Sequence, residues 1–135
     1  MQNMSSDKSA LGLDANVVAG LCYVGNLVCA LGLILSIVTI VTDKTNKLAR
    51  FHAFQSIFLS VLWFVFAFLY WIVAIVGIVL DRSLGFPLFS LVFTLLVLLI
   101  GLVLLIGVIF AAVKAFQGQI FKLPIIGKFA DQYSN

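Results

Sequence analysis

Charged residues are scarce in this chain: they make up 10% of its 135 residues, against roughly 25% in ordinary globular domains. Three long stretches carry no charged side chain at all, at residues 15–42, 53–80 and 83–113. This balance excludes a water-soluble α/β or β domain. The stretches also lack the alternation of apolar and polar residues that marks the strands of a membrane β-barrel.

The groupings of side chains that catalysis and metal binding need are also missing. Asp43, Asp81 and Asp131 are isolated, and His52 has neither a second histidine nor a carboxylate nearby in the sequence. Cys22 and Cys29 would lie about 10.5 Å apart on one helix, too far for a disulfide. We therefore expect no enzymatic activity, no metal and no cofactor. The lack of ionisable groups inside the apolar stretches also argues against a proton-coupled pump.

What is present is apolar surface, at 64% of the residues. A bilayer core of about 30 Å needs roughly 20 apolar residues in a helix, because backbone groups must bond within the segment. The sequence predicts an all-α integral membrane bundle of three transmembrane helices, at about 17–42, 53–80 and 87–113. They would form a single membrane domain, 1–135, with a polar amino-terminal tail, 1–16, and an interfacial carboxyl-terminal tail, 118–135.

The basic residues predict an orientation for three spans. Lys8 and Arg82 fall on one side of the membrane, and six cations fall on the other: Lys44, Lys47, Arg50, Lys114, Lys122 and Lys128. The excess of Lys and Arg marks the cytoplasmic side. The amino terminus is thus predicted outside and the carboxyl terminus in the cytoplasm. We explain the net charge of +3 by basic residues that set this topology and contact lipid headgroups. We therefore expect no nucleic acid partner.

Small residues recur at helical spacing along each stretch, which lets helix backbones approach closely in lipid. The predicted packing residues are Gly25, Cys29, Gly32, Ser60, Ala67, Ala74, Gly77 and Gly101. They would hold the bundle together or join it to other membrane helices, as a homo-oligomer or in a larger complex. The alternative is that one of these faces lines a path for a substrate.

A polar cluster opens the second stretch, and we interpret it as an interaction face. Its members are Arg50, His52, Gln55 and Ser56, with Asn26 contributed from the first stretch. Three of them lie three or four residues apart and share a helix face. We expect His52 to bond a carbonyl or a lipid headgroup. The open alternative is that His52 ligates a haem or a chlorin.

Two segments resemble the Tic20-like family of small membrane proteins, which includes a subunit of the chloroplast import translocon. They are Arg50-Phe51-His52-Ala53-Phe54-Gln55-Ser56, and Ala115-Phe116-Gln117-Gly118 followed by Leu123-Pro124-Ile125-Ile126-Gly127. The resemblance implies a helical membrane fold and partnership in a membrane assembly, and it supplies no catalytic residues.

Together these features predict a non-enzymatic accessory subunit of a membrane protein complex, in contact with the lipid bilayer. The resemblance adds a link to protein translocation. Two alternatives stay open. One is an oligomeric small-solute transporter or channel with a wet path near Asn26, Ser56 and Ser60. The other is a cofactor-binding subunit that uses His52.

Overall fold

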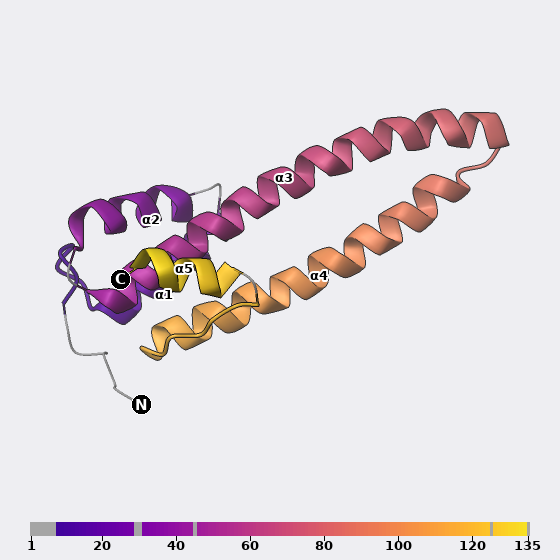
Figure 1. The fold of residues 1–135 in the computed structure, drawn as a ribbon. Helices are drawn as coiled ribbons and strands as arrows, with labels where there is room; N and C mark the ends of the chain where they lie inside the picture. Colours follow the sequence, from indigo (N-terminus) through magenta and orange to yellow (C-terminus); the bar gives the residue numbers. More distant parts are fainter. Residues whose placement is uncertain (1–7, 29–30, 45, 125, 135) are drawn as a thin grey trace. The chain divides into compact units, whose positions relative to one another are not determined.

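The structure is a computed structural model that describes residues 8–28, 31–44, 46–124 and 126–134 (Figure 1). The described residues contain five helices and no strand beyond one isolated bridge between Lys8 and Asp14. The helices are α1 (Ala15–Leu27), α2 (Leu31–Thr42), α3 (Lys47–Leu84), α4 (Leu88–Phe116) and α5 (Ile126–Ser134). The predicted all-α class is therefore confirmed for this part of the chain.

Two helices, α3 with 38 residues and α4 with 29 residues, are long and apolar enough to cross a membrane. The predicted span at 53–80 lies inside α3, and the predicted span at 87–113 begins one residue before α4 and otherwise lies inside it. α3 begins earlier, at Lys47, because Asn46 caps its first turn: the Asn46 side-chain oxygen accepts a hydrogen bond from the Ala49 N–H at 3.2 Å. α4 ends at Phe116, two residues before Gly118, whose φ of 68° lets the chain turn away.

The third predicted span, about 17–42, is not confirmed. In its place stand α1 and α2, with 13 and 12 residues, which measure about 20 Å and 18 Å at 1.5 Å per residue. Each is short of the roughly 30 Å of a bilayer core. α1 ends where Val28 takes an extended backbone, with φ −115° and ψ 90°, and its N–H donates to the Gly25 carbonyl.

The described residues form two compact units. The first contains residues 1–61 and 107–135, and its core is built from alanines, two aliphatic side chains and one tyrosine of α1, α3 and α4. Its buried members are Ala19, Tyr23, Leu59, Val108, Ala111, Ala112 and Ala115, with Phe121, Leu123 and Ile126 packed against them. The second unit, residues 62–106, contains the remaining residues of α3 and α4. The predicted single domain and its two tails stay predictions.

The second unit turns at Gly85, whose φ is 77°. The Asp81 carboxylate accepts hydrogen bonds from the backbone N–H groups of Phe89, at 2.9 Å, and Ser90, at 3.1 Å. These are donors that the first turn of a helix leaves free, so Asp81 caps α4. Further along the same two helices, Tyr70 and Phe93 stack with ring centroids 5.9 Å apart.

Candidate functional site

The polar residues at the start of α3 are buried in the first unit. His52, Gln55 and Ser56 each have 0% of their surface exposed. They share one face because three and four residues separate them along a helix. Burying three polar side chains next to apolar ones is costly unless each finds a hydrogen-bond partner. Each of them finds one, and in every case a backbone carbonyl is involved.

His52 bonds through both ring nitrogens. Nε2 lies 3.1 Å from the Gln119 carbonyl oxygen, and Nδ1 lies 2.9 Å from the Tyr23 hydroxyl. A carbonyl can only accept, so Nε2 carries the hydrogen, and in the neutral ring Nδ1 then accepts from the tyrosine. Tyr23 is itself fully buried. The ring therefore links α1, α3 and the segment that follows α4.

Gln55 makes the next contact along the same face. Its Nε2 donates to the Phe121 carbonyl oxygen at 3.2 Å. Its Oε1 is buried and has no hydrogen-bond partner among the described residues. His52 and Gln55 thus hold carbonyls two residues apart, at positions 119 and 121. The extended backbone between α4 and α5 is fastened to α3 at two points.

Ser56 ties α3 to α1. Its Oγ donates to the Cys22 carbonyl at 2.9 Å. The Asn26 amide nitrogen donates to Ser56 Oγ at 2.7 Å and to the Ser56 carbonyl at 3.2 Å. Ser60 continues the row by donating to the Ser56 carbonyl at 3.0 Å. The structure therefore brings Asn26 to Ser56, and the role of these residues as an interaction face stays a prediction.

Arg50 is placed differently. It is half-buried, and its guanidinium carbon lies 5.9 Å from the centre of the Phe54 ring, within reach of a cation–π contact. Phe54 also approaches Tyr133 of α5, with ring centroids 6.2 Å apart. Arg50 therefore belongs to an aromatic contact between α3 and α5, and the structure does not bring it into the buried row.

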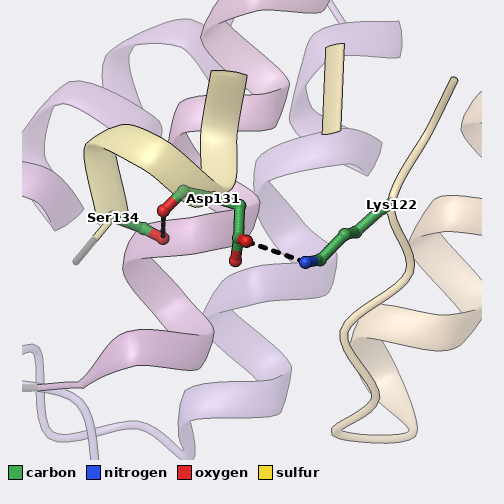
Figure 2. A network of polar contacts seen from close by, with 3 residues as sticks. All are labelled: Lys122, Asp131 and Ser134. Atoms are coloured by element: carbon green, nitrogen blue, oxygen red, sulfur yellow. Dashed lines mark hydrogen bonds and ion pairs between the residues drawn. The ribbon is translucent and has the colours of Figure 1, made fainter. Parts of the chain in front are cut away.

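A second polar contact fastens α5. Lys122 Nζ lies 2.8 Å from Asp131 Oδ2, and Ser134 Oγ donates to the Asp131 carbonyl at 3.3 Å (Figure 2). The hydrogen bond from Lys122 lowers the pKa of the Asp131 carboxyl below its ordinary value, since it stabilises the charged form. Both side chains remain partly exposed, at 52% and 36%, so water screens this ion pair.

The predicted packing residues are divided among several environments. Gly25 and Gly32 face each other across α1 and α2, because a Cβ on Gly25 would lie 2.7 Å from the Gly32 nitrogen. Gly77 packs against Phe89. Ala67 is exposed, Ala74 is half-buried, and a Cβ on Gly101 would meet no atom of the described chain within 4 Å. Cys29 lies outside the described residues. The packing role of these residues stays a prediction.

The second unit contains a shallow pocket of about 110 Å³. Its walls come from the turns of α3 and α4 on either side of Gly85, and they are Tyr70, Val73, Ala74, Gly77, Ile78, Phe89, Ser90, Phe93 and Thr94. The lining is apolar and aromatic, with three hydroxyls, those of Tyr70, Ser90 and Thr94. It provides van der Waals contact and no charged group.

Sequence reasoning missed Tyr23, Gln119 and Phe121. Tyr23 could have been found, because it is the one tyrosine in the first apolar stretch and a buried hydroxyl usually finds a partner. Gln119 and Phe121 contribute only their carbonyls, which every residue has. Among the described residues no group of three or more His, Cys, Asp or Glu side chains could hold a metal ion.

Comparison with known proteins gives a consistent family. The model of the magnetosome magnetite crystal formation protein family (MamF/MmsF) matches residues 14–130. The UPF0132 membrane protein MJ1443 of Methanocaldococcus jannaschii is 35% identical over 128 residues, which cover 94% of each chain. The UPF0132 membrane protein MJ1527 of the same organism is 27% identical, and the aligned residues make up 92% of this chain and 73% of MJ1527. No solved structure matches.

These matches correct the resemblance to the Tic20-like family, which is wrong. The model of a different family matches nearly the whole chain, whereas the Tic20-like assignment depended on two short segments. Short motifs within apolar helices are weak evidence, because many membrane sequences contain similar runs by composition alone. The relatives named as membrane proteins, together with α3 and α4, establish that the chain is a membrane protein.

Proposed function

The chain belongs to the magnetosome magnetite crystal formation protein family, and from this premise we propose that it is a non-enzymatic, structural accessory protein of its membrane. The family description names crystal formation, and the part that we assign to this chain in such a process is mechanical. It holds helices in place in a bilayer for other components. Protein translocation was implied only by the Tic20-like resemblance and is not proposed.

One observation carries this proposal: the buried polar row is bonded to the chain's own elements. His52, Gln55 and Ser56 reach the carbonyls of Gln119, Phe121 and Cys22. Side chains that are occupied in this way rigidify a fold. A transport path would instead need polar groups that a solute can reach.

The same contacts weigh against the two alternatives. A haem ligand needs a ring nitrogen with a free lone pair, and Nδ1 of His52 already accepts from Tyr23. A wet path near Asn26, Ser56 and Ser60 would need their polar atoms to face solvent. Asn26 and Ser60 both bond to Ser56.

The first test is purification of the tagged chain from native membranes in mild detergent, followed by native mass spectrometry. A structural accessory protein should bring at least one partner at fixed stoichiometry. An absorption spectrum of the same sample tests cofactor binding directly, because a haem or pigment would colour it. A colourless complex with a stoichiometric partner is expected. A partner-free homo-oligomer would overturn the proposal.

A matched pair of variants separates a structural bundle from a channel. In a background with both native cysteines replaced, Ser60→Cys and Ser83→Cys are treated in membranes with a water-soluble maleimide. Ser60 is buried and Ser83 is exposed. We expect Ser83→Cys to react and Ser60→Cys to stay unmodified until denaturant is added. Equal reaction rates would favour the channel.

A further inference from the structure

α1 and α2 are antiparallel neighbours. Gly25 lies against Gly32, and the Cys22 thiol lies beside the hydroxyls of Ser36 and Thr39. Residues nearer the amino-terminal end of α1 therefore contact residues nearer the carboxyl-terminal end of α2. The pairing continues beyond the helices, where the Ala10 N–H donates to the Asp43 carboxylate at 3.3 Å. The chain thus returns, after Thr42, to the place where it started before Ala15.

The hairpin exposes an apolar surface. Many of its large apolar side chains are exposed to a third or more of their area: Leu21, Val24, Leu27, Val28, Leu31, Ile34, Ile37, Val38 and Val41. Such a surface is suited to acyl chains. Each helix is only about 20 Å long, so the pair is long enough to enter a bilayer core of about 30 Å and too short to cross it.

Several polar groups in the described part of the hairpin bond to nearby carbonyls of the hairpin itself, which suits the bilayer interior. Where the chain passes from α1 to α2, the Val28 N–H donates to the Gly25 carbonyl and the Leu31 N–H donates to the Val28 carbonyl, both at 3.2 Å. The hydroxyls of Ser36, Thr39 and Thr42 donate to carbonyls one helical turn earlier.

The open end of the hairpin meets two other parts of the first unit. Ala15 at the start of α1 packs with Leu48 and Ala49 at the start of α3, and Ile120 packs against them. Ile120 follows α4. The start of α1, the start of α3 and the segment after α4 therefore lie together, and all three must lie on one side of a membrane that α3 and α4 cross.

We propose that α1 and α2 form a re-entrant hairpin and that the chain crosses the bilayer twice, through α3 and α4. One membrane face then holds seven of the eight cations: Lys8, Lys44, Lys47, Arg50, Lys114, Lys122 and Lys128. Arg82 alone lies on the other face. This excess places the basic face in the cytoplasm, where it meets anionic headgroups. The segment before α1 is then cytoplasmic, opposite to the orientation that three spans predict.

The two topologies differ in one measurable distance. In a re-entrant hairpin, residue 44 lies close to residue 10, because its neighbour Asp43 bonds to Ala10, whereas a spanning helix between them would hold them across a core of about 30 Å. In a background with Cys22 and Cys29 replaced by alanine, the double variant Ala10→Cys/Lys44→Cys should cross-link with a short bifunctional maleimide. The control pair Ala10→Cys/Ser83→Cys should not. Absence of a cross-link in the first pair, with both thiols reactive after denaturation, would overturn the proposal.

Orientation is tested with the same background in intact cells. A membrane-impermeant maleimide should label Ser83→Cys from outside, and should label Ala10→Cys and Gln132→Cys only after permeabilisation. Labelling of Ala10→Cys from outside, with Gln132→Cys protected, would restore three spans. A second measurement avoids the cysteine replacements: green fluorescent protein fused ahead of Met1 or after Asn135 of the native sequence fluoresces only in the cytoplasm. Both fusions should be bright, and a dark amino-terminal fusion beside a bright carboxyl-terminal one would refute the proposal.

Discussion

Replacing Gly32 with alanine should open the hairpin of α1 and α2. The added Cβ would collide with the Cys22 carbonyl oxygen and the Asn26 backbone nitrogen, and would lie 2.7 Å from Asn26 Oδ1. The first two are backbone atoms of a helix and cannot rotate away. Overpacking of this kind costs about 1–3 kcal/mol, and alanine regains about 0.5–1 kcal/mol of helix propensity over glycine. We expect a net loss of about 1–2 kcal/mol.

Hydrogen exchange read by mass spectrometry measures this loss locally, in peptides that cover α1 and α2. A loss of one or two kcal/mol lowers protection by a factor of about 5–30. Gly101→Ala is the matched control, because its Cβ would meet no described atom within 4 Å and only the propensity gain remains. If both variants keep the protection of the parent chain in α1 and α2, the close approach of the two helices is refuted.

Three further predictions test the polar contacts of the first unit. Tyr23→Phe should cost about 1–3 kcal/mol of unfolding free energy in a detergent titration, because it leaves a buried ring nitrogen unpaired, while Tyr70→Phe should be nearly neutral; equal losses would contradict the buried hydrogen bond between Tyr23 and His52. Ser56→Ala removes two ties to α1 and should be similarly costly, and the exposed Ser83→Ala is its control. The pKa of the Asp131 carboxyl is lowered in the folded chain, so the ionised carboxylate contributes to stability above the ordinary pKa of 3.8. This contribution fades as the pH falls below that value. Exchange protection of α5 should therefore drop in that range, and Asp131→Asn should remove the drop; a drop that persists in this variant would assign it to another group.

The sequence predicted the helical class and the two long helices well. Their uncharged stretches, 53–80 and 83–113, are each longer than a bilayer needs, so the helices could shift at their ends without changing the conclusion. The start of α3 depends on Asn46, and the end of α4 depends on Gly118. Both roles are local, and they become recognisable once the structure is known. Hydropathy sets the class of such a chain because no other fold tolerates so much apolar surface.

The hairpin could not be predicted in the same way. Residues 15–42 are as apolar as the spans and contain no proline, so hydropathy averages over the break. Gly25 and Gly32 were predicted as small residues on one face of a single helix, whereas the structure places them on α1 and α2, facing each other. Spacing alone cannot tell whether such residues meet another span or each other after a reversal of the chain.

The buried row at the start of α3 shows a similar division. The shared face of His52, Gln55 and Ser56 follows from their spacing, which is a local property. Their carbonyl partners are far away in the sequence, at positions 119, 121 and 22, and a carbonyl has no residue signature. The grouping was therefore predictable and the contacts were not.

That dependence on carbonyls has a consequence for how this protein tolerates change. Each fastening point places the whole chemical requirement on one side: a histidine, a glutamine or a serine of α3 must keep its side chain, while its partner needs only a backbone. Residue 119 can therefore be exchanged for almost any amino acid that keeps the same path, without loss of the bond, whereas the side chain of Phe121 also packs against the core of the first unit. A saturation library should show intolerant positions on α3 facing a permissive position 119 after α4, so that this connection is invisible to methods that infer contacts from paired substitutions.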